Sequence, residues 1–99
     1  MKIEITGKNQ DVLAISLEGR LDTTTAPELE QVLVKELPGV KKLELDFSKL
    51  EYISSAGLRV LLGAEHTLSQ QEGITVKNVN EYILETFEMT GFLDFLTVE

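Results

Sequence analysis

Residues 42–62 read KLELDFSKLEYISSAGLRVLL, and this stretch joins a strand to a helix. Apolar residues occupy every second position from Leu43 to Phe47, which is the period of a half-buried strand. A turn at residues 54–57 follows, and the leucine pattern after it predicts a helix that runs to about Gln71. The leucines of this helix that are predicted to face the core are Leu58, Leu61, Leu62 and Leu68.

Towards the N-terminus, the pattern predicts a hairpin and then a helix. Ile3 and Ile5 alternate with polar residues, residues 7–11 have turn chemistry, and residues 12–18 form a second strand. A helix follows with Thr25 and Glu28 at capping-box spacing, and Pro38 with Gly39 ends it. The apolar stripe of this helix consists of Leu29, Val32, Leu33 and Leu37.

Towards the C-terminus, residues 74–79 are predicted to form a strand, and Asn80 is predicted to cap a helix that ends at Gly91. Residues 96–98 suit a last short strand. The order of elements is therefore β-β-α-β-α-β-α-β. Alternating strands and helices predict an α/β fold with a largely parallel sheet, opened by an antiparallel hairpin and covered by helices on one face.

Length and composition restrict the class of protein. The 99 residues fit one domain, residues 1–99, and the absence of cysteine excludes disulfides and thiolate metal sites. The net charge of −8 argues against unaided binding of nucleic acid. It is compatible with a basic protein partner, or with solubility and nothing more. Because no leader-like segment and no apolar run of about 20 residues occurs, we expect no membrane span and a cytoplasmic location.

The sequence does not contain the residue motifs of common enzyme active sites. His66 is the only histidine, so a multi-histidine metal site is excluded. It follows Ser55 by three helical turns, too far for a serine–histidine pair. Phosphate-binding glycine loops are absent, and Asp22 and Asp46, near the predicted strand ends, have the usual position of turn or cap residues. We therefore predict no enzyme activity, no catalytic residue, no metal and no cofactor.

The Ser54-Ser55-Ala56-Gly57 turn is the distinctive feature of the sequence. It places two hydroxyls at the start of a helix, where free amides and the positive end of the dipole favour an attached phosphate. From the residues alone a purely structural role is the favoured reading, in which a serine caps the helix and the glycine allows close packing.

Three stretches resemble the signature of STAS domains: residues 46–61, Gly19–Asp22 followed by Thr25-Ala26, and residues 87–91. The resemblance implies a mixed sheet of four or five strands with helices on one face. It also identifies the chain as similar to anti-sigma factor antagonists. Such proteins, when unphosphorylated, bind an anti-sigma factor that is also a serine kinase of switch type. A PP2C-type phosphatase removes the phosphate that this kinase adds.

In that family the usual turn is Asp-Ser-Ser-Gly, with the serine directly before the glycine phosphorylated. Here Ala56 precedes Gly57, Ser55 stands one position earlier, and Ser54 replaces the acidic residue. The resemblance therefore leaves three possibilities, which are phosphorylation of Ser55, phosphorylation of Ser54, and no phosphorylation. The last corresponds to a constitutive STAS interaction module in a transport or signalling complex. A small nucleotide-binding protein or hydrolase is a third reading, which the missing phosphate loop disfavours.

The predicted partner-binding face combines two loops and one helix side, because recognition commonly uses loops at one end of a rigid sheet. Arg59 is included because a cation near a helix start is unfavourable to the dipole, although a solvated arginine explains it equally well. The residues of the predicted face are Asp22, Thr23, Thr24, Ser54, Ser55, Ala56, Gly57 and Arg59.

Overall fold

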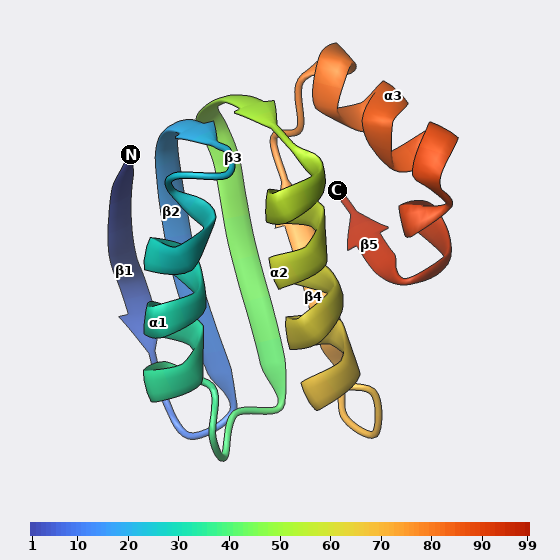
Figure 1. Ribbon diagram of the computed structural model, residues 1–99. Helices are drawn as coiled ribbons and strands as arrows, with labels where there is room; N and C mark the ends of the chain where they lie inside the picture. Colours follow the sequence, from blue (N-terminus) through green and yellow to red (C-terminus); the bar gives the residue numbers. More distant parts are fainter.

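The computed structural model describes residues 1–99 and contains a five-stranded sheet and three α-helices (Figure 1). The predicted order of strands and helices is confirmed. In chain order the elements are β1 (Lys2–Lys8), β2 (Val12–Leu21), α1 (Ala26–Glu36), β3 (Lys42–Ile53), α2 (Ser55–Thr67), β4 (Gly73–Lys77), α3 (Glu81–Thr90), the short 3-10 helix η1 (Phe92–Asp94) and β5 (Leu96–Val98).

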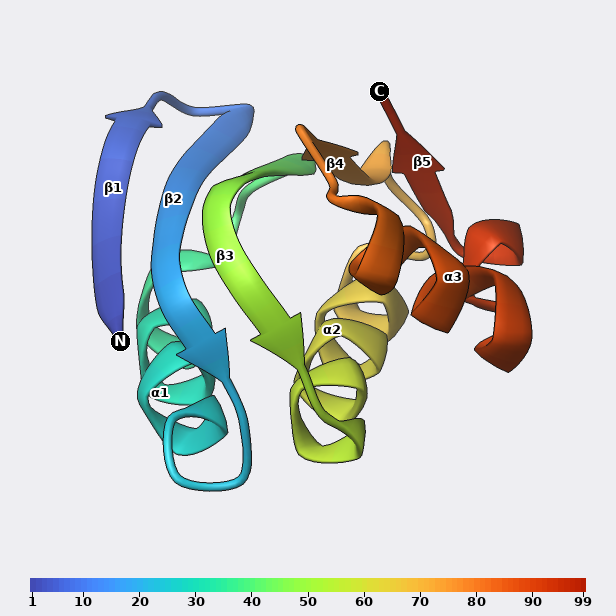
Figure 2. The ribbon, with the colours of Figure 1, turned by 90° about the horizontal axis from the view of Figure 1, so that it is seen from above.

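The strands lie side by side in the order β1-β2-β3-β4-β5. β1 pairs with β2 antiparallel, and every other pair is parallel. Figure 2 shows α1, α2 and α3 on one side of the sheet, which is the consequence of successive crossovers of the same hand. The predicted fold class, a mixed sheet with helices packed on one face, is confirmed.

One hydrophobic core lies between the sheet and the helices. It contains 23 buried residues, and Phe47 of β3 packs on Phe87 of α3 with ring centroids 6.4 Å apart. The opposite face of the sheet is polar, and Glu44 there forms ion pairs with Lys42 and Lys77 at 3.7 and 3.4 Å. None of the helices is long and apolar enough to cross a bilayer.

The helix ends follow local signals where no distant group competes. The Asn80 side chain accepts a hydrogen bond from the Ile83 N–H at 2.8 Å, as the predicted cap requires, and its amide donates to the Leu50 carbonyl at 3.0 Å. Gly91 ends α3 with a φ of 78°, a conformation that favours glycine. Asn80 therefore both starts α3 and ties it to β3.

Other predicted boundaries differ from the structure. β3 continues to Ile53 because Leu50 and Ile53 are also buried, so Asp46 lies inside the strand and not at its end. α2 ends at Thr67, earlier than predicted, and the predicted core residue Leu62 is 43% exposed. That leucine lies on the side of α2 that neither the sheet nor a neighbouring helix covers fully.

Candidate functional site

Two loops meet at the end of the sheet where β2 and β3 finish. The first, residues 22–25, joins β2 to α1, and the second, residues 54–57, leads from β3 into α2. The Ser54 N–H donates a hydrogen bond to the Leu21 carbonyl at 2.9 Å and fixes the two loops to each other. Because parallel neighbouring strands end at the same edge, both loops and the starts of α1 and α2 lie at the top in Figure 1.

Asp22 organises the first loop. Its Oδ1 accepts hydrogen bonds from the Thr24 hydroxyl at 2.8 Å, the Thr24 N–H at 3.0 Å and the Thr25 N–H at 3.1 Å. The Thr24 hydroxyl, together with these amides, holds the pKa of Asp22 below its ordinary value. The carboxylate is thus ionised and fixed in place, while Thr23 and Thr24 are exposed beside it.

The predicted capping box of α1 is wrong. Thr25 stands at the cap position, but its side chain makes no cap hydrogen bond. Its hydroxyl donates to the Arg20 carbonyl at 2.7 Å and accepts from the Asp22 N–H at 2.8 Å. These contacts are available only because the chain turns back at the end of β2, so the Thr25 side chain stabilises the loop, and only its backbone carbonyl accepts hydrogen bonds from the first turn of α1.

The second loop distinguishes the two serines. Ser54 is half-buried and caps α2, since its Oγ accepts a hydrogen bond from the Gly57 N–H at 3.4 Å. Ser55 is the first residue of α2 and is exposed, and no hydrogen bond within the protein occupies its hydroxyl. Ala56 is half-buried and packs against the core. Ser55 therefore presents the accessible hydroxyl of this turn.

Gly57 lets α2 approach the ends of both strands. A Cβ at this position would lie 2.7 Å from Cγ of Leu21 and 2.9 Å from Cγ1 of Ile53. Contacts that short require a shift of the backbone or of buried side chains. The glycine therefore sets the height of the helix start, and of Ser55, above the sheet.

Sequence reasoning missed an aromatic cluster next to these loops. The Arg20 guanidinium lies 4.2 Å from the ring centroid of Tyr52 and approaches Asp22 with its Nε 4.0 Å from Oδ2. The rings of Tyr52 and Tyr82 are 5.7 Å apart. Arg20 and Tyr52 are partners in the β2–β3 register. Their equivalent positions on two neighbouring parallel strands could have indicated from the sequence that the two side chains meet. Tyrosine and arginine are among the residue types enriched in binding hot spots.

Arg59 lies one helical turn after Ser55 on the exposed side of α2. It forms no ion pair within the protein. His66, on the same helix, is exposed, as predicted for a solvated residue. No group of three or more acidic, histidine or cysteine side chains comes together in a way that could hold a metal ion.

The carboxylates Asp22 and Asp46 make the fold sensitive to acid. The Asn78 amide, at 3.0 Å, and the Ser48 N–H, at 2.9 Å, hold the pKa of Asp46 below its ordinary value of 3.8. A carboxyl with a lower pKa in the folded chain stabilises the fold above its unfolded pKa. That contribution is lost as the pH falls through the folded pKa. We therefore expect the free energy of unfolding to decrease below about pH 4.

Urea denaturation at about pH 6 and about pH 3 measures this decrease. Asp46→Asn should make the decrease smaller, because the variant has no carboxylate to protonate. Asp94→Asn is the matched control, since Asp94 is exposed and its carboxylate makes no hydrogen bond. An equal acid-induced loss in both variants would contradict the role of Asp46.

Comparison with known proteins gives a consistent result. The family model described as Mlab, STAS domain, matches residues 5–97. BtrV of Bordetella bronchiseptica, assigned provisionally as an anti-sigma factor antagonist, is 34% identical, with 92% of this chain and 80% of BtrV covered. The anti-sigma-B factor antagonist of Listeria monocytogenes is 29% identical and covers 100% of this chain and 89% of its own length.

Solved structures show the same fold. The anti-sigma factor antagonist SpoIIAA in its unphosphorylated form has a TM-score of 0.84 at 17% identity, over 99% of this chain and 88% of SpoIIAA. SpoIIAA of Bacillus in its phosphorylated form has a TM-score of 0.75, also at 17% identity, over 99% of this chain and 91% of that one. At this identity the likeness concerns the fold.

Proposed function

The chain belongs to the STAS domain family, and on that premise we propose that it is an anti-sigma factor antagonist. In this function it is a protein-binding switch, a single STAS domain over residues 1–99, which sequesters a kinase-type anti-sigma factor. The observation that carries the proposal is the exposed hydroxyl of Ser55 at the start of α2, in a loop that the Ser54–Leu21 backbone hydrogen bond joins to the loop of Asp22. The names of the relatives BtrV and the Listeria protein support it.

The proposed binding face consists of Asp22, Thr23, Thr24, Ser54, Ser55, Ala56, Gly57 and Arg59. Its support is geometric, because one backbone hydrogen bond joins the two loops and both are anchored on adjacent strands. We add the cluster of exposed Arg20, half-buried Tyr52 and exposed Tyr82. A rigid face of this kind loses little conformational entropy when a partner covers it.

Phosphorylation of Ser55 is the proposed control. The kinase transfers the γ-phosphoryl group of ATP to Oγ of Ser55, the hydroxyl proton passes to a base of the kinase, and ADP leaves. The phosphate adds about −1.5 to −2 charges at pH 7. Helix starts tolerate such charge, so the fold persists while the surface that meets the partner changes. SpoIIAA, with phosphorylated and unphosphorylated forms, gives a precedent on this fold.

In this proposal the protein itself is not an enzyme and needs no cofactor. Its partners are the switch-type serine kinase that acts as anti-sigma factor and a PP2C-type phosphatase that hydrolyses the phosphoserine. Both would act in the cytoplasm, where sigma factors and ATP are present. The net charge of −8 supports a protein partner over direct contact with nucleic acid.

The direct test incubates the protein with the purified anti-sigma factor kinase of its source organism and ATP, and maps phosphate by mass spectrometry. Phosphate is expected on Ser55 and absent from Ser55→Ala. Phosphate on Ser54 would move the site by one residue. Tight binding with no phosphate on either serine would favour a constitutive STAS interaction module.

Substitutions in the proposed binding face are expected to weaken affinity for the kinase. Asp22→Ala removes the acceptor that orders the first loop, and Arg59→Glu reverses the charge next to Ser55. Each is expected to weaken affinity for the kinase several-fold, measured by calorimetry. Glu72→Lys, an exposed charge reversal in the loop before β4, is the control and should have no effect. Unchanged affinity in both face variants would show that the partner binds elsewhere.

A further inference from the structure

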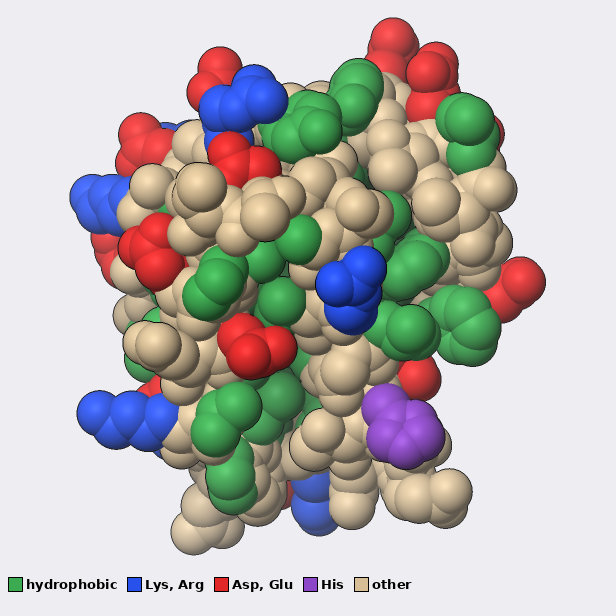
Figure 3. All heavy atoms as spheres, viewed as in Figure 1, with side chains coloured by type: hydrophobic (Ala, Val, Ile, Leu, Met, Phe, Trp, Pro, Cys, Tyr) green, Lys and Arg blue, Asp and Glu red, His purple; other side chains and the backbone are tan.

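Arg59 is a cation without a partner in the domain. It forms no ion pair and donates no hydrogen bond to another side chain. Arg20, the other arginine, approaches Asp22 and lies over the ring of Tyr52. In Figure 3 the basic side chain over α2 has hydrophobic and uncharged atoms around it and no acidic side chain against it. Because an unpaired cation near a helix start is unfavourable to the dipole, nothing within the unmodified domain accounts for this arginine.

The helical neighbours of Arg59 include one polar side chain. Residues three and four positions apart on a helix share a face, with Cβ atoms about 5–6 Å apart. For Arg59 these neighbours are Ser55, Ala56, Leu62 and Gly63. Ser55 is exposed, and no hydrogen bond within the protein occupies its hydroxyl. Ser55 is therefore the one side chain on this face of α2 that can carry an anionic group.

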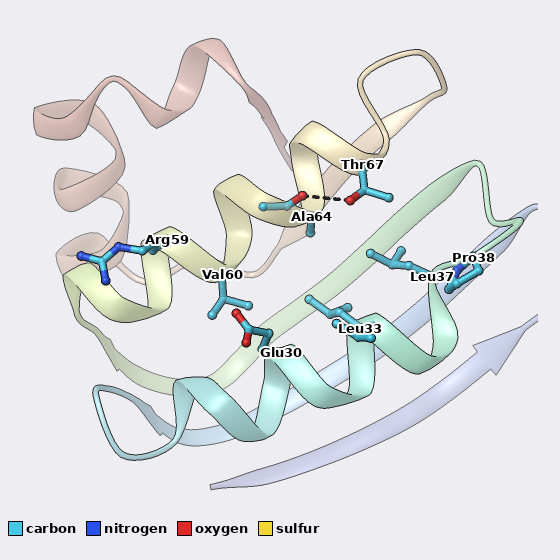
Figure 4. A pocket seen from close by; sticks show the side chains of 10 residues that line it. Glu30, Leu33, Leu37, Pro38, Arg59, Val60, Ala64 and Thr67 are labelled. Atoms are coloured by element: carbon cyan, nitrogen blue, oxygen red, sulfur yellow. Dashed lines mark hydrogen bonds between the residues drawn. The ribbon is translucent and has the colours of Figure 1, made fainter.

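The side chain of Arg59 extends towards that serine. Side chains on a helix lean towards its N-terminus, and Figure 4 shows Arg59 directed to the end at which α2 begins. Glu30 of α1 lines the same hollow between the helices, but it forms no ion pair with Arg59. In Figure 4 Glu30 points towards Val60 instead. The guanidinium is thus free to meet an anion one turn earlier on its own helix.

Ser54 has no comparable relation to Arg59. It precedes α2 and is half-buried, and its Oγ accepts the hydrogen bond of the Gly57 N–H. Five positions along a helix correspond to about 140° around its axis, so Ser54 and Arg59 do not share a face. A phosphate on Ser54 would also have to replace the cap. The position of Arg59 therefore favours Ser55 over Ser54.

We propose that Arg59 holds the phosphate of phosphorylated Ser55, in a bidentate ion pair along one turn of α2. This inference rests on the proposed function, because it requires a phosphate on Ser55. An anion four residues before a cation is the favourable order on a helix, and the first turn of α2 carries no acidic residue to repel the phosphate. Guanidinium and phosphate form strong paired hydrogen bonds. Phosphorylation then both covers Ser55 and turns the donors of Arg59 away from a partner.

The ion pair is tested in the whole chain, with phosphoserine incorporated in place of Ser55 during translation, so that no kinase is needed. Phosphorus NMR follows the second ionisation of the phosphate, which occurs near about pH 6. A guanidinium in contact favours the doubly charged form. The midpoint pH is therefore expected to be lower by about 0.5 with Arg59 than in Arg59→Gln, the shift that an exposed ion pair produces. Arg59→Lys should restore part of this difference.

Two matched controls separate the pair from general charge effects. Lys35→Gln removes the same charge from an exposed residue in the last turn of α1, and its midpoint pH should equal that of wild type. Phosphoserine in place of Ser69, an exposed serine beyond the end of α2, should titrate alike with Arg59 and with Arg59→Gln. Circular dichroism verifies that every variant is folded. Equal midpoints at Ser55 with and without Arg59 would overturn the ion pair.

Calorimetry with the purified kinase distinguishes failure of this inference from failure of the proposed function. The expected result is weak binding of the protein phosphorylated at Ser55, together with the lowered midpoint pH. Weak binding with equal midpoints would overturn the ion pair and leave the proposed switch intact. Equal binding of the phosphorylated and unphosphorylated proteins would overturn the proposed function, while a lowered midpoint would still establish the ion pair.

Discussion

Ser55→Asp is expected to weaken affinity for the anti-sigma factor kinase at least tenfold, while Ser55→Ala binds as the wild type does. The aspartate adds a negative charge at the first residue of α2, whose first turn carries no acidic residue. Within the domain the helix dipole favours this charge. At the interface it must be desolvated together with the ionised Asp22 of the neighbouring loop. A tenfold loss corresponds to only about 1.4 kcal/mol, within reach of one misplaced interfacial charge.

Calorimetry with the purified kinase measures the affinity, and circular dichroism should show an unchanged spectrum for Ser55→Asp. Ser69→Asp is the matched control, because it adds the same charge at an exposed serine beyond the other end of α2. It should bind normally. If both aspartate variants lost affinity equally, total charge would be the cause and Ser55 would have no special role.

Gly57→Ala is expected to destabilise the fold by about 1–3 kcal/mol, the usual cost of overpacking a core. The added methyl would lie 2.7 Å from Cγ of Leu21 and 2.9 Å from Cγ1 of Ile53, and both leucine and isoleucine are buried. The helix propensity gained from alanine offsets only up to about 1 kcal/mol. Since the start of α2 must move away from the sheet, Ser55 moves with it, and partner affinity should decrease as well.

Gly63→Ala, in the same helix, should have the opposite sign. Its methyl meets open space, so only the gain in helix propensity remains, up to about 1 kcal/mol. Urea denaturation of both variants measures the free energy of unfolding and tests this difference in sign, provided that their m-values are equal. A Gly57→Ala variant as stable as wild type would mean that Leu21 and Ile53 repack without cost. The two loops would then be less rigidly joined than the structure indicates.

Several parts of the site depend on contacts that no local pattern shows. Thr25 and Glu28 have capping-box spacing, yet the Thr25 hydroxyl binds the Arg20 carbonyl at 2.7 Å, because the loop brings that carbonyl within reach. Arg20 and Tyr52 are far apart in sequence and meet only through the β2–β3 register. The Thr25 hydroxyl can either cap α1 or bind a carbonyl elsewhere, and only the folded chain determines which of these hydrogen bonds forms.

The sequence by itself determined the order of elements, the start and end of α3, and the serine pair at the head of α2. Each depends on groups within a few residues of one another, as the Asn80 cap and the left-handed Gly91 show. Only the tertiary structure decided which serine is exposed, and why two glycines of one helix differ. Gly57 faces Ile53 at the end of β3 and Leu21 of the distant strand β2, while a Cβ at Gly63 would meet no atom within 4 Å, and the contact with Leu21 exists only because the fold brings the two segments together.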